Sequence, residues 1–365
     1  RWQTAGGRNR SLNSSAKGRC LMPRNERKDT IKKIEAERSG RLCMAYVTST
    51  RQNFEIAMAD DAVRVLYDHL ETGKDTAEKG VDLFVHSNGG SGTVPWQIVS
   101  FVREYTKSLA VLVPHRAFSA ATLLAMGADE IIMHQMGRLG PIDPSVANIF
   151  NPPHPGNPGM PAPISVEDVT AYFKLVKEEV GITHEDELIQ AFVALTEKIH
   201  PLALGNVQRS HNQARMMARK LLKQHMSLET QEHEIDQIID NLKSNLFYHG
   251  HPINRDEAKK DLKLKVVNAP PALADHMWKL YLEYEKDMKL NESLQPQHEL
   301  DIAAVPPAAP VALAPAPAPG MPPQMAAMFA AQAAAQQQHP KVRLDKMPGA
   351  YVESVSHVDC FVTDL

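Results

Sequence analysis

Apolar and polar residues follow one another along the middle of the chain in a way that predicts alternating strands and helices. Four nearly continuous apolar runs are typical of strands buried on both faces: Leu42–Val47, Val81–His86, Leu109–Val113 and Glu130–His134. Helical patterns lie between them: Asp60–Thr72, Val94–Tyr105 and Ala120–Met126. This alternation predicts an α/β domain with largely parallel strands and a functional site at the strand ends.

Beyond this region the pattern becomes helical. A Pro- and Gly-rich stretch, Asn151–Pro163, predicts a loop beside the site. Helical periodicity follows in four segments: Val166–Glu179, Glu185–Ile199, Val207–Gln224 and Thr230–Leu242. Aromatic residues around Trp278 indicate a last helix that packs on the core. We therefore expect one domain over residues 41–298, with a helical C-terminal extension at 164–298.

The two ends of the chain differ in composition from this domain. Residues 1–33 hold ten Lys or Arg against two acidic residues, which predicts a basic disordered arm over residues 1–40 with one short helix near Ile31–Glu37. Residues 299–350 are rich in Pro, Ala and Gln and predict a disordered linker. Residues 351–365 alternate apolar and polar positions, and we expect a C-terminal tail.

Composition narrows the function classes. A net charge of -3 gives no global attraction to nucleic acid, so no nucleic-acid partner is expected. The basic arm leaves peripheral association with anionic membranes open as an alternative. Three widely spaced cysteines predict neither a disulfide framework nor a metal cluster, and they favour a reducing, cytoplasmic location. No apolar run predicts a transmembrane helix. The chain begins at Arg1 and not at Met, so we expect an incomplete N-terminus.

Two strand-to-helix turns carry the candidate chemistry. Ser119 stands where the strand Leu109–Val113 and its turn lead into an apolar helix, so its hydroxyl lies at a helix start. The second turn, His86–Gly92, holds three glycines, which let a backbone approach a ligand closely and point amide protons at it. Together they predict a serine nucleophile beside an oxyanion hole. The alternatives are an N-cap role for Ser119 and two ordinary tight loops.

The order of several motifs resembles a known family. The chain reads Val81-Asp82-Leu83-Phe84-Val85-His86-Ser87-Asn88-Gly89-Gly90, then Ala117-Phe118-Ser119-Ala120-Ala121-Thr122, Ala128-Asp129-Glu130-Ile131, Leu139-Gly140-Pro141-Ile142-Asp143-Pro144, and His249-Gly250-His251-Pro252-Ile253 with Glu257-Ala258. These segments are similar to the serine dehydrogenase proteinase family of the Clp protease and crotonase superfamily, which is related to signal peptide peptidase A. The similarity spans roughly Leu42 to Val267.

The resemblance implies a fold and an activity. The implied fold is the Clp/crotonase-like ββα spiral, with Ser119 as the nucleophile and with Gly89, Gly90 and Ala120 forming the oxyanion hole. The implied function is a serine peptidase that acts on peptide or protein substrates as a homo-oligomer, without a cofactor or metal. One alternative is a non-catalytic Clp-like scaffold that has lost its general base. Another is a crotonase-like enzyme that acts on acyl-CoA.

The general base is where the chain departs from the family pattern. In signal peptide peptidases a lysine follows the serine, but the comparable place here reads Pro161-Ala162-Pro163. Lys174 and Lys177 lie nearby, within the predicted helix. The histidine of Clp protease also has no counterpart, since the similar position falls near Ile142 or Asp143.

Other histidines remain candidates for the base. His249 or His251 could act with Asp143 as the orienting carboxylate, because a triad is defined by geometry and not by chain order. His134, at the end of a strand, is a further alternative. Each histidine can also have a capping or turn role. No metal site is expected, because no further ligand stands at the right spacing from His249 and His251.

Overall fold

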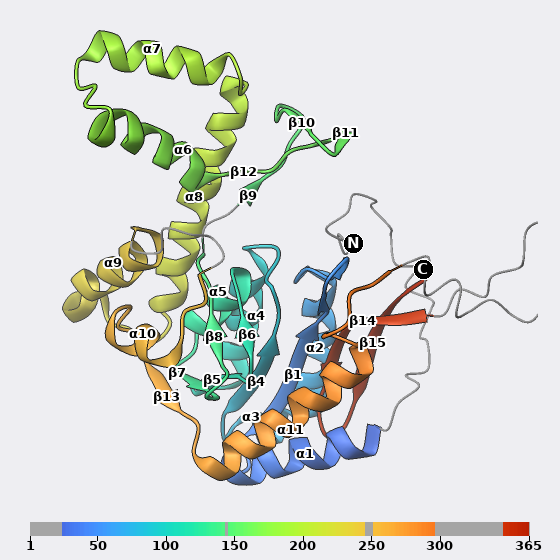
Figure 1. Ribbon diagram of the computed structural model, residues 1–365. Helices are drawn as coiled ribbons and strands as arrows, with labels where there is room; N and C mark the ends of the chain where they lie inside the picture. The colour runs from blue at the N-terminus through green and yellow to red at the C-terminus, as the bar shows by residue number, and fades with distance from the viewer. Residues whose placement is uncertain (1–23, 143–144, 245–250, 296–345, 365) are drawn as a thin grey trace, which may run out of the picture.

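A mixed sheet forms the centre of the computed structural model, which describes residues 24–142, 145–244, 251–295 and 346–364 (Figure 1). The sheet has seven strands in the order β13-β7-β5-β4-β1-β14-β15. Five of them are parallel: β1 (Leu42–Thr48), β4 (Val81–His86), β5 (Leu109–Val113), β7 (Glu130–Met133) and β13 (Val266–Asn268). Two are antiparallel at one edge: β14 (Lys346–Glu353) and β15 (Val358–Asp364). The predicted α/β class and its four buried strands are confirmed.

Helices cover both faces of the sheet, because successive residues of each buried strand point to opposite sides. Leu109, Val111 and Val113 of β5 pack with one apolar cluster, whereas Ala110 and Leu112 pack with the other. The helices that contribute to the first cluster include α2 (Asp61–Thr72), α4 (Val94–Tyr105) and α5 (Ala120–Met126). Two cover the opposite face: α1 (Arg24–Glu37) and α11 (Pro271–Met288). A short helix, α3 (Lys74–Ala77), follows α2.

Helix α1 belongs to the folded body, so the prediction of a disordered arm as far as residue 40 is wrong for residues 24–40. Ile31 and Ile34 are fully buried against the α11 cluster. Arg27 is also buried, and its Nε donates to Glu353 Oε2 at 2.7 Å. The basic composition misled the prediction because the carboxylate that neutralises Arg27 lies 326 residues away.

The C-terminal residues form two strands of the sheet, in contrast to the predicted tail at 351–365. Strand β14 pairs with β1 through Tyr46 and Val352, and β15 continues the sheet beyond it. His69 of α2 contacts the hairpin of β14 and β15 from the face of the sheet opposite α1. Its Nδ1 lies 2.9 Å from Ser354 Oγ, and its Nε2 lies 3.2 Å from Asp359 Oδ2. Burial lowers the pKa of His69 to about 4. The predicted linker at 299–350 lies outside the described part as far as residue 345, whereas its last residues, 346–350, belong to β14, so the linker prediction is wrong there.

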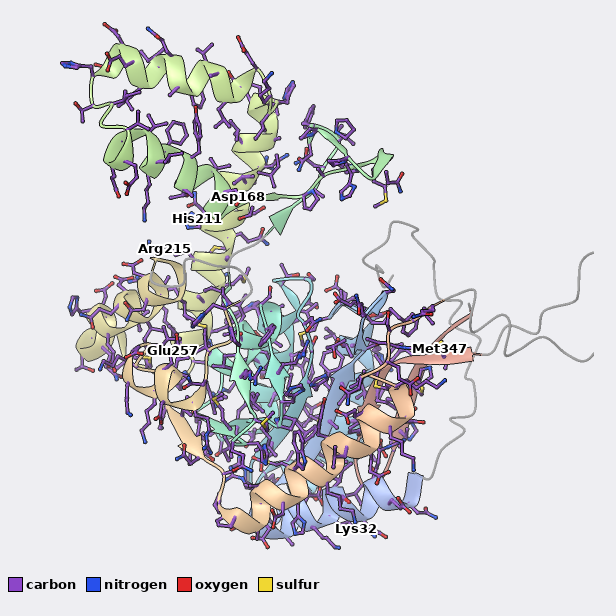
Figure 2. All side chains as sticks on the ribbon, viewed as in Figure 1. Lys32, Asp168, His211, Arg215, Glu257 and Met347 are labelled. Atoms are coloured by element: carbon purple, nitrogen blue, oxygen red, sulfur yellow. The ribbon has the colours of Figure 1, made fainter. Side chains whose placement is uncertain are left out.

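The first helices of the helical extension project from one end of the sheet, whereas its last helices pack on the apolar cluster of α5 (Figure 1). Its elements are α6 (Val166–Lys174), the π-helix η1 (Leu175–Glu179), α7 (Glu185–Thr196), α8 (Pro201–Leu222), α9 (Leu228–Ser244) and α10 (Arg255–Lys260). Figure 2 shows side chains on several sides of α6 and α7 that point away from the rest of the protein. The predicted helices are confirmed, although α8 begins at Pro201, since Pro fits the first turn of a helix.

Short strand pairs complete the fold. The predicted loop at Asn151–Pro163 contains a hairpin, β10 (Pro153–His154) with β11 (Asn157–Pro161). Further pairs are β2 (Thr50–Arg51) with β3 (Phe54–Glu55), β6 (Arg116–Ala117) with β8 (Arg138–Leu139), and β9 (Ser145–Val146) with β12 (Ile164–Ser165). Among the described helices, none is both long and apolar enough to cross a membrane. The repeating ββα spiral stays a prediction.

The buried pair of Arg27 and Glu353 predicts a large effect of mutation on stability. Arg27→Met leaves the fully buried Glu353 carboxylate without its cation, and we expect the free energy of unfolding to fall by about 3–5 kcal/mol. Arg64→Met is the control, because Arg64 pairs with Asp68 on the exposed surface of α2, where we expect less than about 1 kcal/mol. Urea denaturation followed by circular dichroism measures both; equal losses would contradict the prediction.

Candidate active site

The backbone at Ser119 has an unusual conformation for a residue with a side chain. Its φ is 51° and its ψ is -115°, immediately before α5. A non-glycine residue held in such a region costs about 1–3 kcal/mol, and strain of this kind is found at active sites. The Ser119 side chain makes no capping hydrogen bond to α5. The alternative N-cap role for Ser119 is therefore wrong.

The turn at Ser119 is held on both sides. Phe118 N donates to Ser87 O at 3.0 Å, and Ala121 N donates to Phe118 O at 2.9 Å. All seven residues of α5 are buried. Because that helix is enclosed by apolar neighbours, it cannot rotate to relieve the turn without exposing part of the core. The Ser119 side chain itself is partly exposed, as a nucleophile must be.

The glycine turn lies directly against Ser119. A Cβ added to Gly89 would be 2.7 Å from the Ser119 Cβ and 2.9 Å from Ala120 N. A Cβ added to Gly90 would be 2.3 Å from Met58 O, because Gly90 pairs with Met58 in an isolated bridge. Only glycine fits at either place. The structure thus brings together Ser119, Gly89, Gly90 and Ala120, four of the predicted site residues.

The backbone amides of the two turns differ in their hydrogen bonding. Gly89 N donates to Ser87 Oγ at 3.0 Å. In contrast to the prediction, the Gly89 amide is thus engaged and is not available to an oxyanion. Within the described residues, neither Gly90 N nor Ala120 N has a hydrogen-bond partner. These two amides are the ones free to bind a developing negative charge.

Ser87 joins the two turns, a role that the sequence analysis missed. Its N donates to Arg116 O at 3.1 Å, its O accepts from Phe118 N, and its Oγ accepts from Gly89 N. Thr48 Oγ1 of β1 donates to the same Oγ at 2.8 Å. Ser87 is buried, so these bonds are shielded from water. A serine two residues before Gly89 was the available signal, because Ser often accepts a hydrogen bond from a nearby backbone amide.

Among the described residues, no side chain forms a hydrogen bond with the Ser119 hydroxyl. Arg116, three residues before Ser119, lies with its guanidinium carbon 5.6 Å from the centre of the Phe118 ring, and its Nη1 donates to Asn88 Oδ1 at 3.3 Å. Arginine stays protonated in proteins and cannot act as a base. Asp143 and His249, two of the predicted residues, lie outside the described part.

His251 has a carboxylate partner among the described residues. Its Nε2 lies 2.7 Å from Glu257 Oε1 of α10, a residue labelled in Figure 2. Backbone pairing connects the segment that bears His251 to the residues before Ser119. Ile253 pairs with Leu139, and Leu139 pairs with Ala117. Ala117 and Ile253 are thus two strand spacings, or about 10 Å, apart.

The structure separates the other base candidates from Ser119. His134 packs against α11, its ring stacked on Trp278 with centroids 5.0 Å apart, and its Nδ1 accepts from Met136 N. Ile132, which shares its strand face, belongs to the α11 cluster, whereas α5 packs on the opposite face. Lys174 and Lys177 lie on α6 and η1, in the projecting extension (Figure 1). None of these three contacts Ser119.

His86, His115 and His134 lie at the ends of β4, β5 and β7, in that order. The rings of His86 and His115 stack with centroids 5.7 Å apart, and both pack on Tyr281 of α11. Burial lowers the pKa of His115 to about 4 and that of His86 well below its usual value. His86 and His115 are therefore neutral side chains that pack against α11. Within the described residues, no cluster of His, Cys, Asp or Glu could hold a metal ion.

Comparison with known proteins finds a family model that matches part of the chain. Residues 19–155 match the model of a family described as ClpP-like SDH-type serine proteinase, a range that includes both turns. The chain is 29% identical to the uncharacterized protein MJ0137 of Methanocaldococcus jannaschii over 206 residues, 56% of this chain and 59% of that protein. It is 38% identical to the uncharacterized protein MJ1495 of the same organism over 66 residues, 18% of this chain and 23% of that protein. The chain thus spans less than two thirds of either relative.

The hydrogen bonds of Ser87 predict how strongly it supports the two turns. Ser87→Ala removes the acceptor of both Gly89 N–H and the Thr48 hydroxyl, and we expect a loss of about 1–3 kcal/mol in the free energy of unfolding. Ser91→Ala is the matched control, because Ser91 Oγ bonds only to Thr93 on the exposed side of the same turn, with an expected change within about 0.5 kcal/mol. Thermal and urea unfolding measure both, and a Ser87 variant as stable as the control would refute this role.

Proposed function

We propose that this chain, whose residues 19–155 belong to the ClpP-like SDH-type serine proteinase family, is a serine peptidase with Ser119 as its nucleophile. The observation that carries the proposal is the backbone at Ser119, with φ at 51°, no capping bond and two unpaired amides beside it in the described structure. A sharp turn of this kind between a strand and a helix presents a serine hydroxyl to substrate in known hydrolases.

The proposed reaction divides peptide hydrolysis into two steps. Ser119 Oγ attacks the carbonyl carbon of the scissile bond while a base takes its proton, and a tetrahedral intermediate forms. The amides of Gly90 and Ala120 donate to its oxyanion, each contributing on the order of 3 kcal/mol. The intermediate collapses, the amine leaves with a proton, and water then hydrolyses the acyl group on Ser119. No cofactor enters this scheme.

We propose that the general base is a histidine in the segment of residues 249–251. His251 is supported by its 2.7 Å contact with Glu257, because a carboxylate that holds an imidazole also stabilises the charge it gains. The pairing of Ile253 with Leu139 ties this segment to the strand next to β6. A closure that brings the imidazole to hydrogen-bond distance of Ser119 would then complete the site, since catalytic hydrogen bonds often tighten only with substrate. His249 with Asp143 is the alternative pairing.

The proposed substrate class follows from the description of the matched family. The family description favours a peptide over an acyl-CoA thioester. A scaffold without activity does not require a partly exposed serine in a costly conformation, so the backbone of Ser119 favours an enzyme.

We also propose that the protein assembles as a homo-oligomer through the projecting extension. Helix α7 has no buried residue although half of it is apolar. Ile189, Phe192 and Val193 are about half exposed, at 54%, 47% and 48%. Exposed apolar groups that lie close together on one helix mark interaction sites.

The nucleophile is tested by covalent labelling. A fluorophosphonate should label the full-length protein at one serine, identified as Ser119 by peptide mass spectrometry, and Ser119→Ala should abolish the signal. Ser91→Ala, a change on the exposed side of the neighbouring turn, should label as the wild type does. Absence of labelling in folded wild-type protein between pH 6 and about 9, the range in which histidine and lysine bases titrate, would overturn the proposal.

The base is tested with the same reagent. Removal of the residue that accepts the proton should slow labelling by about 10²-fold or more at neutral pH, so His251→Ala and His249→Ala are compared. If His251 is the base, Glu257→Gln slows the reaction as well, because the ring loses its orienting carboxylate. Lys177→Ala on the distant extension is the control. Labelling at the wild-type rate in both histidine variants would contradict the proposed segment.

The oligomer is tested on α7. Phe192→Asp places a charge in the proposed contact, and we expect a smaller assembly in sedimentation velocity at micromolar concentration. Glu187→Lys, a charge change on the same helix, is the control for a general effect of surface charge. Identical sedimentation of wild type and Phe192→Asp, or a monomeric wild type, would refute this contact.

A further inference from the structure

Two arginines lie on neighbouring strands next to the candidate active site. Arg116 of β6 and Arg138 of β8 are direct partners in the parallel pairing of these strands. The residues that follow them, Ala117 and Leu139, are buried in the apolar cluster of α5. Because successive side chains of a strand point to opposite faces, both arginines project away from that cluster. Arg116 is half-buried and Arg138 is exposed, so solvent reaches both.

The positive charges of this pair are not balanced. Within the described residues, no carboxylate forms an ion pair with Arg116 or Arg138. The Glu285 carboxylate of α11 hydrogen bonds with the Tyr281 hydroxyl instead. Burial, Arg116 and Arg138 together lower the pKa of His115 to about 4, so both charges act on the same ring. Like charges at directly opposite positions of two strands destabilise the pairing, which favours an anion between them.

The guanidinium of Arg116 is held in place before any ligand binds. Its carbon lies 5.6 Å from the centre of the Phe118 ring, and its Nη1 donates to Asn88 Oδ1 at 3.3 Å. A guanidinium has five N–H donors, so most of those of Arg116 stay available to a ligand. A side chain that is already fixed loses little rotamer entropy on binding, which makes Arg116 the stronger half of the pair.

The contacts of Arg116 connect the pair to Ser119. Phe118 immediately precedes Ser119 in the chain. Asn88 immediately precedes Gly89, whose added Cβ would be 2.7 Å from the Ser119 Cβ. The guanidinium thus contacts one residue beside the nucleophile and one residue beside the glycine turn. An extended peptide advances about 3.3 Å per residue, so its side chains within about three positions of the scissile bond lie within about 10 Å of Ser119.

Given the proposed peptidase function, on which this inference rests, we propose that Arg116 and Arg138 bind a substrate carboxylate, an Asp or Glu side chain within about three residues of the scissile bond. Planar guanidinium groups match the two oxygens of a carboxylate, and hydrogen bonds between charged partners are stronger than those between neutral ones. A lysine in the same position of the substrate meets two like charges. The pair therefore selects acidic peptides and discriminates against basic ones.

The first test measures specificity with the full chain. A peptide library is digested, and mass spectrometry identifies the residues around each new terminus. We expect Asp or Glu to exceed Lys or Arg by about tenfold at one position near the cleaved bond. Arg138→Glu should remove this preference, because the new carboxylate pairs with Arg116, and it should not lower the midpoint of thermal unfolding. Lys107→Glu, an exposed change before the other end of β5, is the matched control and should keep the wild-type preference.

A binding test that needs no catalysis separates the arginine pair from the peptidase function. Fluorescence anisotropy with Ser119→Ala compares two labelled peptides of Ala and Gly that differ only in a central Glu or Lys. The Glu peptide should bind about tenfold more tightly, and Ser119→Ala/Arg138→Glu should bind both alike.

Three results would overturn the role of the arginine pair. They are Ser119-dependent cleavage without an acidic preference, an unchanged acidic preference in folded Arg138→Glu, and equal or absent binding of the two peptides to Ser119→Ala. The first of these leaves the peptidase function standing. Charge-selective binding to Ser119→Ala without cleavage by the wild type would support the arginine pair and contradict the peptidase function.

Discussion

The conformation of one residue, Ser119, is the constraint on which the candidate site depends. Its φ of 51° costs free energy, and the surrounding structure offsets that cost with a fully buried helix after it and a hydrogen-bonded turn before it. Gly89 can approach the Ser119 Cβ only because it has no side chain. As a result, two amides without partners in the described structure flank a partly exposed hydroxyl.

The sheet that carries these turns is completed by both ends of the described chain. Helix α1 covers one face, and β14 pairs with the edge of β1, the strand that also supplies Thr48 to Ser87. Arg27 links the two additions, since its guanidinium contacts the rings of both Tyr284 and Tyr351 and pairs with Glu353. The C-terminal hairpin is therefore part of the scaffold that positions the site and not an appendage.

Local patterns were enough to predict much of this arrangement. The buried strands, α5 and the position of Ser119 each follow from a short run of residues, because burial on both faces leaves a continuous apolar segment. Features that depend on distant partners were missed. Arg27 is buried only because it pairs with Glu353. Strand β14 contains Pro348 and Gly349, so its sequence alone does not predict a strand. The contact of His251 with Glu257 was also not predicted, because side-chain geometry decides it.

The central claim is that Ser119 makes this protein a peptidase. Incubation of the wild type with a complex peptide library, followed by mass spectrometry of newly formed termini, tests that claim most directly. We expect new N- and C-termini that accumulate with time in the wild type and that are absent with Ser119→Ala. New termini that form equally with Ser119→Ala, or none with a folded wild type, would contradict it.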